Sequence, residues 1–288
     1  MRILALSDLH LDYIRLRNGL GIDEEMEIVK ILLEKISSEN ADIFIFAGDI
    51  SAKLWEIELF FKGLKAFSGI KVFLPGNHDL WREGNVSSDE KYYKKLPELC
   101  ANYGFFYLPQ GFLEINGLVI VGTTGWYDYS FGSDYYEEKI FEKGEYKGIR
   151  WRETYWKLID FNRNGMKLGN KEICELMLSQ FRDNLVKVSN YKDIIAVTHF
   201  LPFEELLSIK NFFSAYLGTK KLEEIILQHN IKRVICGHEH RYGIYNIKNI
   251  EIYKPTFGYL DDPKKVKEKI EKTSIVIEVS DYNRFSVI

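Results

Sequence analysis

The sequence contains few cysteines. The three that are present, Cys100, Cys174 and Cys236, are odd in number and far apart, and none stands in a Cys-x-x-Cys spacing. A disulfide framework or a thiolate zinc site is therefore not expected. Unpaired thiols are typical of a reducing compartment, which predicts a cytoplasmic protein.

Long apolar runs are also missing. No segment approaches the roughly 20 apolar residues that span a membrane. The run that begins at Met1 ends at Leu6 and is too short for the apolar part of a signal peptide. We therefore expect no membrane partner.

An excess of positive charge is absent as well. Lys and Arg number 39 against 42 Asp and Glu, which gives a net charge of −3. Nucleic-acid-binding proteins usually carry a basic surface, so a nucleic-acid partner stays open but is not favoured. The chain has no repeats, and with 288 residues and a hydrophobic content of 46% it can bury a large core.

Six apolar runs, rich in Ile, Val and Phe, predict buried strands. They lie at 3–6, 43–47, 72–74, 118–121, 194–197 and 234–236. Near-continuous hydrophobicity indicates strands that are covered on both faces. Helical spacing of apolar residues occurs between them, at Met26, Val29, Leu33 and Ile36, less clearly at Leu59, Leu64 and Phe67, and again at Leu222, Ile225 and Ile226. This alternation predicts an α/β layered fold.

The pattern changes after His240. Short strand-like pieces follow one another, with one helical stretch rich in Lys and Glu among them, and they lie at 244–247, 250–253, 274–279 and 284–287. We expect this end of the chain to complete a second sheet.

Five short polar motifs follow the ends of apolar runs. In chain order they are Asp8-Leu9-His10, Gly48-Asp49, Gly76-Asn77-His78-Asp79, Thr198-His199 and Gly237-His238-Glu239-His240. Ligands of open α/β sheets bind beyond the carboxyl ends of strands, so we expect these motifs to meet there. The glycines in them suit tight turns in which a Cβ atom would interfere.

The residue types in these motifs suit a site for two metal ions. Alternate side chains of an extended chain point the same way, so Asp8 and His10 can face one point, as can His238 and His240. Asp49 offers two carboxylate oxygens, which can bridge ions about 3.5–4 Å apart. Imidazole, carboxylate and amide ligands favour Mn, Fe, Zn, Co or Ni over Ca.

In order and composition the five motifs resemble the calcineurin-like metallophosphoesterases. This resemblance implies a sandwich of two mixed β-sheets flanked by helices, with the metals at the strand ends. Because the motifs extend over most of the chain, we predict one domain over residues 1–288. The resemblance also implies two divalent metal ions, the first held by Asp8, His10, Asp49 and His240, and the second by Asp49, Asn77, His199 and His238.

The catalytic groups expected from this family lie in its Asn-His-Asp segment. The resemblance implies that His78 contacts phosphate and protonates the leaving group while a hydroxide that bridges the metals attacks. Asp79 is predicted either to orient the His78 ring and raise its pKa or to cap a helix over 80–83. Trp81 either lines the pocket or packs in the core. His229, outside the motifs, is expected to serve the end of a helix.

The predicted activity is hydrolysis of a small phosphodiester or phosphomonoester. The segment Asn77-His78-Asp79 resembles the phosphodiesterase and nuclease branches, and the Asp-Arg-Gly of protein phosphatases is absent after Gly48-Asp49. A DNA-repair-type nuclease is the alternative enzyme, and the lack of a basic stripe argues against it. A non-catalytic metal-binding scaffold is a further alternative, but such proteins typically lose the histidine that is present here as His78.

The segment 124–170 is expected to be an insertion in the domain. It holds twelve aromatic residues, too many for a disordered linker. Trp151, Tyr155 and Leu158 share one helical face, which predicts a helix there. Eight basic and eight acidic side chains balance in this segment, which leaves a substrate cap or a contact surface of a homo-oligomer as alternatives. In the cap alternative, Trp126 and Trp151 influence KM.

Overall fold

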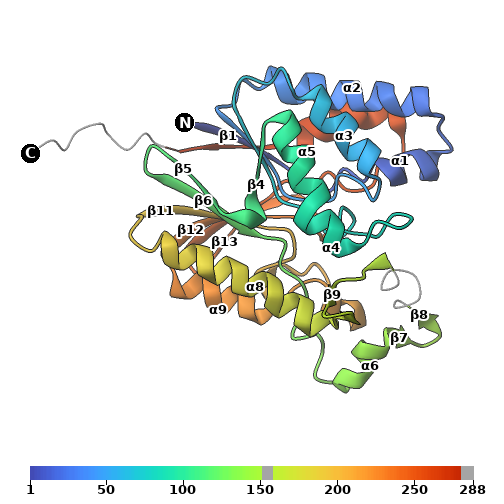
Figure 1. The fold of residues 1–288 in the computed structure, drawn as a ribbon, viewed down its shortest axis with the longest axis vertical. Helices are drawn as coiled ribbons and strands as arrows, with labels where there is room; N and C mark the ends of the chain where they lie inside the picture. The colour runs from blue at the N-terminus through green and yellow to red at the C-terminus, as the bar shows by residue number, and fades with distance from the viewer. Residues whose placement is uncertain (151–157, 280–288) are drawn as a thin grey trace, which may run out of the picture.

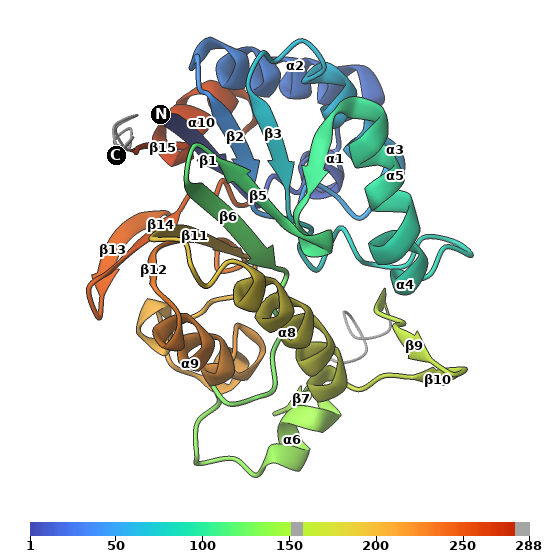
Figure 2. The same ribbon diagram turned by 60° about the vertical axis from the view of Figure 1, so that its left-hand side comes forward.

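The computed structural model describes residues 1–150 and 158–279. Two mixed β-sheets of five and six strands are stacked, and helices cover the outer face of each (Figure 1). Figure 2 shows the same two layers from a second direction, with the five-stranded sheet above and the six-stranded sheet below. This is the sandwich that the sequence predicts.

The first sheet contains the N-terminal part of the chain and one strand from its C-terminal part. Its strand order is β15 (Ile275–Glu278), β1 (Arg2–Leu6), β2 (Ile43–Phe46), β3 (Ile70–Phe73) and β4 (Phe105–Tyr107). Strands β1 to β4 are parallel, and β15 is antiparallel to β1. The predictions for β1, β2 and β3 are confirmed, whereas β4 was not predicted.

The second sheet contains the later strands. Its order is β13 (Gly243–Ile247), β14 (Ile250–Lys254), β12 (Ile231–Cys236), β11 (Asp193–Thr198), β6 (Leu118–Thr123) and β5 (Phe112–Ile115). The four inner strands are parallel, and the two edge strands are antiparallel to their neighbours. Antiparallel edges on a parallel sheet are common in mixed α/β folds.

The last described strand differs from the prediction. We expected the strands after His240 to complete the second sheet, and β13 and β14 do so, but β15 pairs with β1 in the first sheet. Ile275 and Ile277 of β15 pack in the layer between the sheets, a position that either sheet could offer to an apolar strand. The apolar pattern therefore predicted a strand but not its partner. The predicted piece at 284–287 lies outside the described residues.

Alternate residues of each strand face two different apolar layers. In β1, Ile3 and Ala5 pack between the sheets, whereas Leu4 and Leu6 belong to the cluster that includes the helices. All four are almost completely buried. Strands that are covered on both faces need apolar residues at every position, which explains the continuous runs in the sequence.

Helices cover both outer faces. Over the first sheet lie α1 (Leu11–Asn18), α2 (Ile22–Ser38), α3 (Leu54–Gly63), α4 (Ser88–Glu90) with the π-helix Lys91–Lys95, α5 (Leu96–Tyr103) and α10 (Val266–Thr273). Over the second sheet lie α8 (Asn170–Lys187) and α9 (Lys220–Gln228). Short 3-10 helices connect them at Leu108–Gln110, Glu204–Leu206, Phe212–Tyr216 and Pro263–Lys265. Among the described helices, none combines the length and hydrophobicity that a membrane crossing requires.

The helix predicted from the spacing of Met26, Val29, Leu33 and Ile36 is α2. Val29 and Ile36 are buried in the core together with Ile28 and Leu32, while Met26 is 46% exposed. The sequence Met26-Glu27-Ile28-Val29 offers apolar residues on two adjacent lines of the helix surface. Spacing alone does not decide which line faces the sheet.

The aromatic-rich segment connects β6 to α8. It contains α6 (Glu138–Lys143) and two small hairpins, formed by β7 (Glu145–Tyr146) with β8 (Ile149–Arg150) and by β9 (Asn162–Arg163) with β10 (Met166–Lys167). Some of its aromatic residues, among them Tyr129 and Phe141, pack against the 3-10 helix Phe212–Tyr216 in a separate cluster, whereas Trp126, Phe131 and Phe161 belong to the main core. The predicted helix around Trp151 and Tyr155 lies outside the described residues. The division of the chain into one domain with an insertion stays a prediction.

Candidate metal centre and active site

The five polar motifs occupy loops that directly follow strands β1, β2, β3, β11 and β12. Backbone hydrogen bonds join these loops: Asp8 N–H donates to the Gly48 carbonyl at 2.8 Å, and Gly237 N–H donates to the His199 carbonyl at 3.1 Å. The His238 N–H donates to Asp8 Oδ1 at 3.0 Å and connects the two groups of loops, so the carboxyl ends of strands from both sheets meet at one edge of the sandwich. This is the location that the sequence predicts for the motifs.

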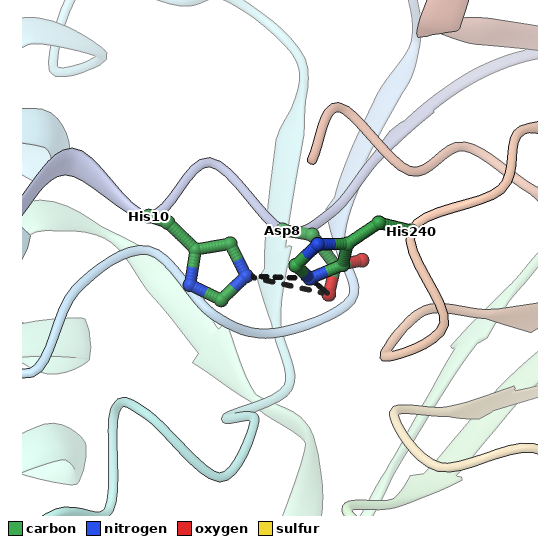
Figure 3. Close-up of side chains that lie close together, drawn as sticks. All are labelled: Asp8, His10 and His240. Carbon is green, nitrogen blue, oxygen red and sulfur yellow. Dashed lines mark hydrogen bonds and ion pairs between the residues drawn. The ribbon is translucent and has the colours of Figure 1, made fainter. Parts of the chain in front are cut away.

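Asp8, His10 and His240 form the first cluster (Figure 3). The Nε2 atoms of His10 and His240 lie 2.9 Å apart. The Asp8 Oδ1 atom lies 3.8 Å from the first of these nitrogens and 3.6 Å from the second. Asp8 and His10 are completely buried, whereas the side chain of His240 is 23% exposed. The three ligand atoms therefore converge, and His240 is the member on the solvent side.

Asp49 connects this cluster to a second one. Its Oδ2 atom lies 3.6 Å from His10 Nε2 and 3.3 Å from His199 Nε2. Its Oδ1 atom accepts a hydrogen bond of 2.8 Å from the backbone N–H of His78. One oxygen of the carboxylate is thus shared between histidines of both clusters, as a bridging ligand requires.

His199, His238 and Asn77 complete the second cluster around Asp49. The His199 Nδ1–H donates to the Ala47 carbonyl at 2.9 Å, and its Nε2 lies 3.0 Å from Asn77 Oδ1. The bond to the carbonyl keeps a proton on Nδ1, so Nε2 is the ring atom that a metal ion would bind in place of a proton, a usual arrangement for a metal-binding histidine.

His238 is held by contacts on both of its sides. Its backbone N–H donates to Asp8 Oδ1 at 3.0 Å, and its ring Nε2 lies 3.3 Å from the carbonyl oxygen of Tyr216. A proton on Nε2 would leave Nδ1 as the ligand atom. The ring of Phe200 packs against the imidazole with centroids 4.0 Å apart.

Several of these residues have a left-handed backbone. The φ angle is 59° at Asp8, 48° at His10, 65° at Asp49 and 69° at His238. Residues with side chains adopt this region rarely, and they cluster at functional sites when they do. Gly76 shows how tightly the loops pack, because a Cβ atom there would lie 2.2 Å from Asp49 Oδ1.

The hydrogen bonds of Asp79 differ from those expected for a residue that orients the His78 ring or caps a helix. Its Oδ2 accepts from the backbone N–H groups of Asp49 at 2.7 Å and Gly76 at 2.8 Å, and its Oδ1 accepts from Ile50 at 2.9 Å and Ser51 at 3.1 Å. None of these bonds involves the His78 ring. The chain from 78 to 81 forms a turn and no helix begins there, so the capping prediction is wrong. Asp79 ties the loop after β2 to the loop after β3.

His78 lies beside the clusters in a fixed orientation. Its ring stacks on Trp81 with centroids 3.7 Å apart and meets the His10 ring edge-on at 4.4 Å. Its side chain is also within ligand distance of His10 and Asp49, so the geometry by itself permits a metal-ligand role as well as the predicted acid role. His229 lies outside these groups of ligands, with Nδ1 2.8 Å from the Ile225 carbonyl at the end of α9, as predicted.

Burial and the neighbouring carboxylates shape the charges. Burial lowers the pKa of His10 well below its usual value and lowers that of His78 to about 4. Burial also acts to lower the pKa of His199, but Asp49 outweighs it and raises this pKa to about 9. Although burial acts to raise the pKa of Asp49, His199 and His78 hold it well below its usual value. In the structure without metal, an imidazolium therefore balances the buried carboxylate.

The donor set fits divalent transition metals. Three groups of ligand atoms, each within 4.8 Å of one another, are formed by Asp8, His10 and His240, by His10, Asp49 and His78, and by Asp49, His199 and His238. Imidazole nitrogen and carboxylate oxygen are the ligands that such ions prefer. A bound metal cation would also replace the imidazolium as the positive charge that balances the buried carboxylate, which would leave the histidines neutral. The described residues can therefore hold metal ions, while the identity of the metal stays a prediction.

A pocket of about 170 Å³ opens above these groups. Besides ligand residues it is lined by His78, Trp81, Trp126, Tyr127, Ile159, Phe200, Tyr216, Leu217 and Tyr259. No Lys or Arg is among its described lining residues. Trp126 and Trp81 both contribute to the wall. The side chain of Trp81 is only 7% exposed and also packs in the hydrophobic core, so this residue both lines the pocket and packs in the core. We did not predict Phe200 or Tyr216, because aromatic residues that follow a motif carry no signal of their own.

The comparisons with known proteins agree with this geometry. Residues 1–242 match the family model for calcineurin-like phosphoesterases. A phosphopantetheinyl hydrolase from Mycobacterium tuberculosis is similar in structure, with a TM-score of 0.68 and 18% identity over 94% of this chain and 91% of that one. A dimetal phosphatase from Danio rerio has a TM-score of 0.51 and 12% identity over 88% and 86% of the two chains. No curated protein matched the sequence. The match over most of its length shows that the chain belongs to the calcineurin-like phosphoesterase family.

Proposed function

We propose that this protein is a metal-dependent hydrolase of small phosphoesters that binds two divalent metal ions. The observation that carries the proposal is the position of Asp49, whose Oδ2 lies 3.6 Å from His10 Nε2 and 3.3 Å from His199 Nε2. One carboxylate between two histidine clusters is the arrangement needed for a pair of ions. Family membership supports the same activity.

The ligand residues divide into two sets around Asp49. Asp8, His10 and His240 would hold the first ion, and Asn77, His199 and His238 the second. When bound, the ions would supply Lewis acidity, would lower the pKa of a water molecule, and would stabilise charge on both oxygens of an in-line displacement. The protein contributes the fixed geometry, through the Ala47 carbonyl behind His199 and the Asp79 bonds behind Asp49.

His78 is the proposed proton donor to the leaving group. Its ring is held between Trp81 and His10 and is only 6% exposed. Because burial lowers its pKa to about 4, the ring is neutral in the structure without substrate. An anionic phosphoester next to the ring would raise this pKa, since an opposite charge nearby favours the protonated form. The proton would thus be taken up with the substrate and passed to the leaving oxygen.

The walls of the pocket favour a small ester with an apolar or aromatic group. Rings of Trp126, Tyr127 and Phe200 line it, and its described lining residues include no Lys or Arg. A nuclease needs several cationic contacts to a regular series of phosphates, so the nuclease alternative is not favoured. The scaffold alternative is disfavoured because His78 and the two ligand sets are all present.

A panel of phosphoesters assayed with single metals after chelation tests the proposal. We expect a small phosphodiester such as bis(4-nitrophenyl) phosphate to be cleaved at least as well as 4-nitrophenyl phosphate, and duplex DNA to be a poor substrate. A phosphopantetheinyl ester belongs in the panel because the structurally similar enzyme bears that name. Hydrolysis that is unaffected by chelators, or no hydrolysis of any ester with any of the five metals, would overturn the proposal.

A further inference from the structure

A second groove, of about 640 Å³, adjoins the aromatic pocket. The two cavities share His240 and Tyr259, so the groove begins at the first ligand cluster. It lies between the loop after β14 and helix α10. Arg17 from α1 and three lysines, Lys265, Lys269 and Lys272, contribute to its lining. The groove therefore supplies the cations that the described wall of the aromatic pocket does not have.

Two of these cations have no carboxylate partner among the described residues. Of the acidic residues in the groove, Asp261 is paired with Arg17 at 2.9 Å, and Asp262 accepts a hydrogen bond of 3.0 Å from the backbone N–H of Lys264. The third, Glu268, is exposed and lines the groove without an ion pair in the described part of the chain. Lys265 and Lys272 form no ion pair with the described residues. Their ammonium groups are available for an anion that enters the groove.

Thr256 provides a second, independent observation. It lines the groove and is 1% exposed, and its hydroxyl oxygen has no hydrogen-bond partner among the described residues. Buried polar groups without partners are rare in native proteins and call for an explanation. A hydroxyl can donate to an anionic oxygen, so a bound anion would satisfy it.

The loop that contains Thr256 is hydrogen-bonded to the loop that contains Asp8. The backbone N–H of Phe257 donates to the Ser7 carbonyl, and that of Gly258 donates to the Asp8 carbonyl, each at 2.9 Å. Gly258 has a φ of +67°, and a Cβ atom there would lie 3.1 Å from the Cβ of His240. Lys269 donates to the Tyr259 carbonyl from the other side. The loop that lines the groove is therefore held directly against the loop of Asp8, a member of the first cluster.

We propose that this groove binds a second phosphate group of the substrate. The substrate class is then a phosphodiester with an apolar or aromatic group on one side and a phosphorylated arm on the other. The aromatic pocket takes the first group, the ligand clusters hold the ester to be cleaved, and Lys265, Lys272 and Thr256 contact the distal phosphate. This inference rests on the proposed function for the location of the cleaved ester.

A matched pair of substrates tests the inference. One is 4-nitrophenyl 3-phosphopropyl phosphate, and the other is 4-nitrophenyl 3-hydroxypropyl phosphate, which lacks only the distal phosphate. Water cleaves the first into 4-nitrophenol and propane-1,3-diol bisphosphate. We expect a lower KM for the phosphorylated ester, and an equal KM for the two esters would overturn the inference.

Paired variants identify the groove as the cause. Lys265→Gln with Lys272→Gln should raise KM for the phosphorylated ester by roughly fivefold, as expected for two exposed charge contacts. Lys264→Gln with Lys267→Gln removes the same charge from exposed residues that do not line the groove, and should leave that KM unchanged. Equal effects of the two double variants would show long-range electrostatics instead of a subsite and would overturn the inference.

Thr256→Val separates binding from folding. Because the hydroxyl has no partner within residues 1–150 and 158–279, replacing it with a methyl group should not lower the melting temperature. The same variant should raise KM for the phosphorylated ester more than for the hydroxyl ester. A lower melting temperature together with an unchanged ratio of the two KM values would contradict the assignment of Thr256.

Binding without hydrolysis keeps the two proposals distinguishable. Calorimetric titration of propane-1,3-diol bisphosphate into the full-length protein needs no turnover. Weaker binding to the Lys265 and Lys272 variant than to the Lys264 and Lys267 variant supports the subsite even if no ester is cleaved, in which case only the proposed function fails. Equal binding to both variants overturns the subsite while leaving the proposed function intact.

Discussion

The Nε2 atoms of His10 and His240 lie 2.9 Å apart although 230 residues separate them in the sequence. With Asp8 Oδ1 and Asp49 Oδ2 within 3.8 Å of His10 Nε2, two imidazoles and two carboxylates converge on one point. Such a group of buried ligand atoms is stable only with protons or a cation between them. The ligand sets and the groove beside them lead to separate experiments.

Measurement of the metal content tests the two ligand sets. We expect two divalent ions per chain by elemental analysis of protein reconstituted after chelation. Asp49→Asn should lower the content, because its Oδ2 lies 3.6 Å from His10 Nε2 in the first cluster and 3.3 Å from His199 Nε2 in the second. A stoichiometry near one in the metal-saturated protein would contradict the assignment of two sets.

His78→Ala tests the proton donor. We expect kcat to fall by roughly 10² to 10⁴, the usual contribution of a positioned acid, with metal content nearly intact. His229→Ala is the matched control, because that histidine lies at the end of α9 and bonds only a carbonyl of its own helix. Loss of metal in His78→Ala would identify His78 as a ligand, a role that its distance to His10 and Asp49 also permits.

Asp79→Asn tests the connection between the two loops. An amide nitrogen would replace one of the oxygens that accept from the N–H groups of Asp49, Gly76, Ile50 and Ser51. We expect the free energy of unfolding to fall by about 1–3 kcal/mol and metal affinity to fall with it. Asp183→Asn, an exposed position on α8, should change stability little. Urea unfolding and metal titration measure both effects, and a fully stable Asp79→Asn would refute this role.

Glu56 predicts a dependence of stability on pH. The side chain is completely buried and accepts a hydrogen bond from Ser51, and burial raises its pKa from 4.5 to about 8. The folded protein keeps this proton between the two values while the unfolded chain loses it, so this contribution is complete below pH 4.5 and is lost as pH rises towards 8. Urea unfolding at pH 5 and pH 8 should show a smaller loss in Glu56→Gln than in the unmodified protein. Equal losses would contradict the shift.

Trp126→Phe tests the wall of the pocket. The change keeps an aromatic ring but removes the hydrogen bond of 2.9 Å from Trp126 Nε1 to Asn170 Oδ1. We expect KM for an aromatic phosphodiester to rise roughly two- to tenfold, the value of one such bond, with metal content unchanged. Trp55→Phe is the control, because Trp55 is 42% exposed on α3 and does not line the pocket. A change from dimer to monomer with unaltered kinetics would favour the interface alternative for the segment 124–170.

The sequence alone predicted most strands and the meeting of the five motifs. Strands covered on both faces must be apolar throughout, so runs such as 43–47 and 194–197 are visible without any structure. The polar residues that follow them stand out because nothing else interrupts the apolar core at those points. Asp8, Asp49 and His199 could therefore be placed at one edge of the sheets from their positions in the chain.

The tertiary structure alone decided which strands and walls lie side by side. The apolar pattern of β15 fits the edge of either sheet, and only packing selects β1 as its partner. The sequence predicts a catalytic or a capping role for Asp79, whereas only the packing of the two loops shows that its carboxylate accepts hydrogen bonds from the backbone of the Asp49 loop. The cations of the second groove come from α1, from the 3-10 helix Pro263–Lys265 and from α10, more than 240 residues after α1, and no local pattern connects Arg17 with Lys265. Local sequence encodes the periodicity of one element, whereas a site made of several elements depends on how they pack.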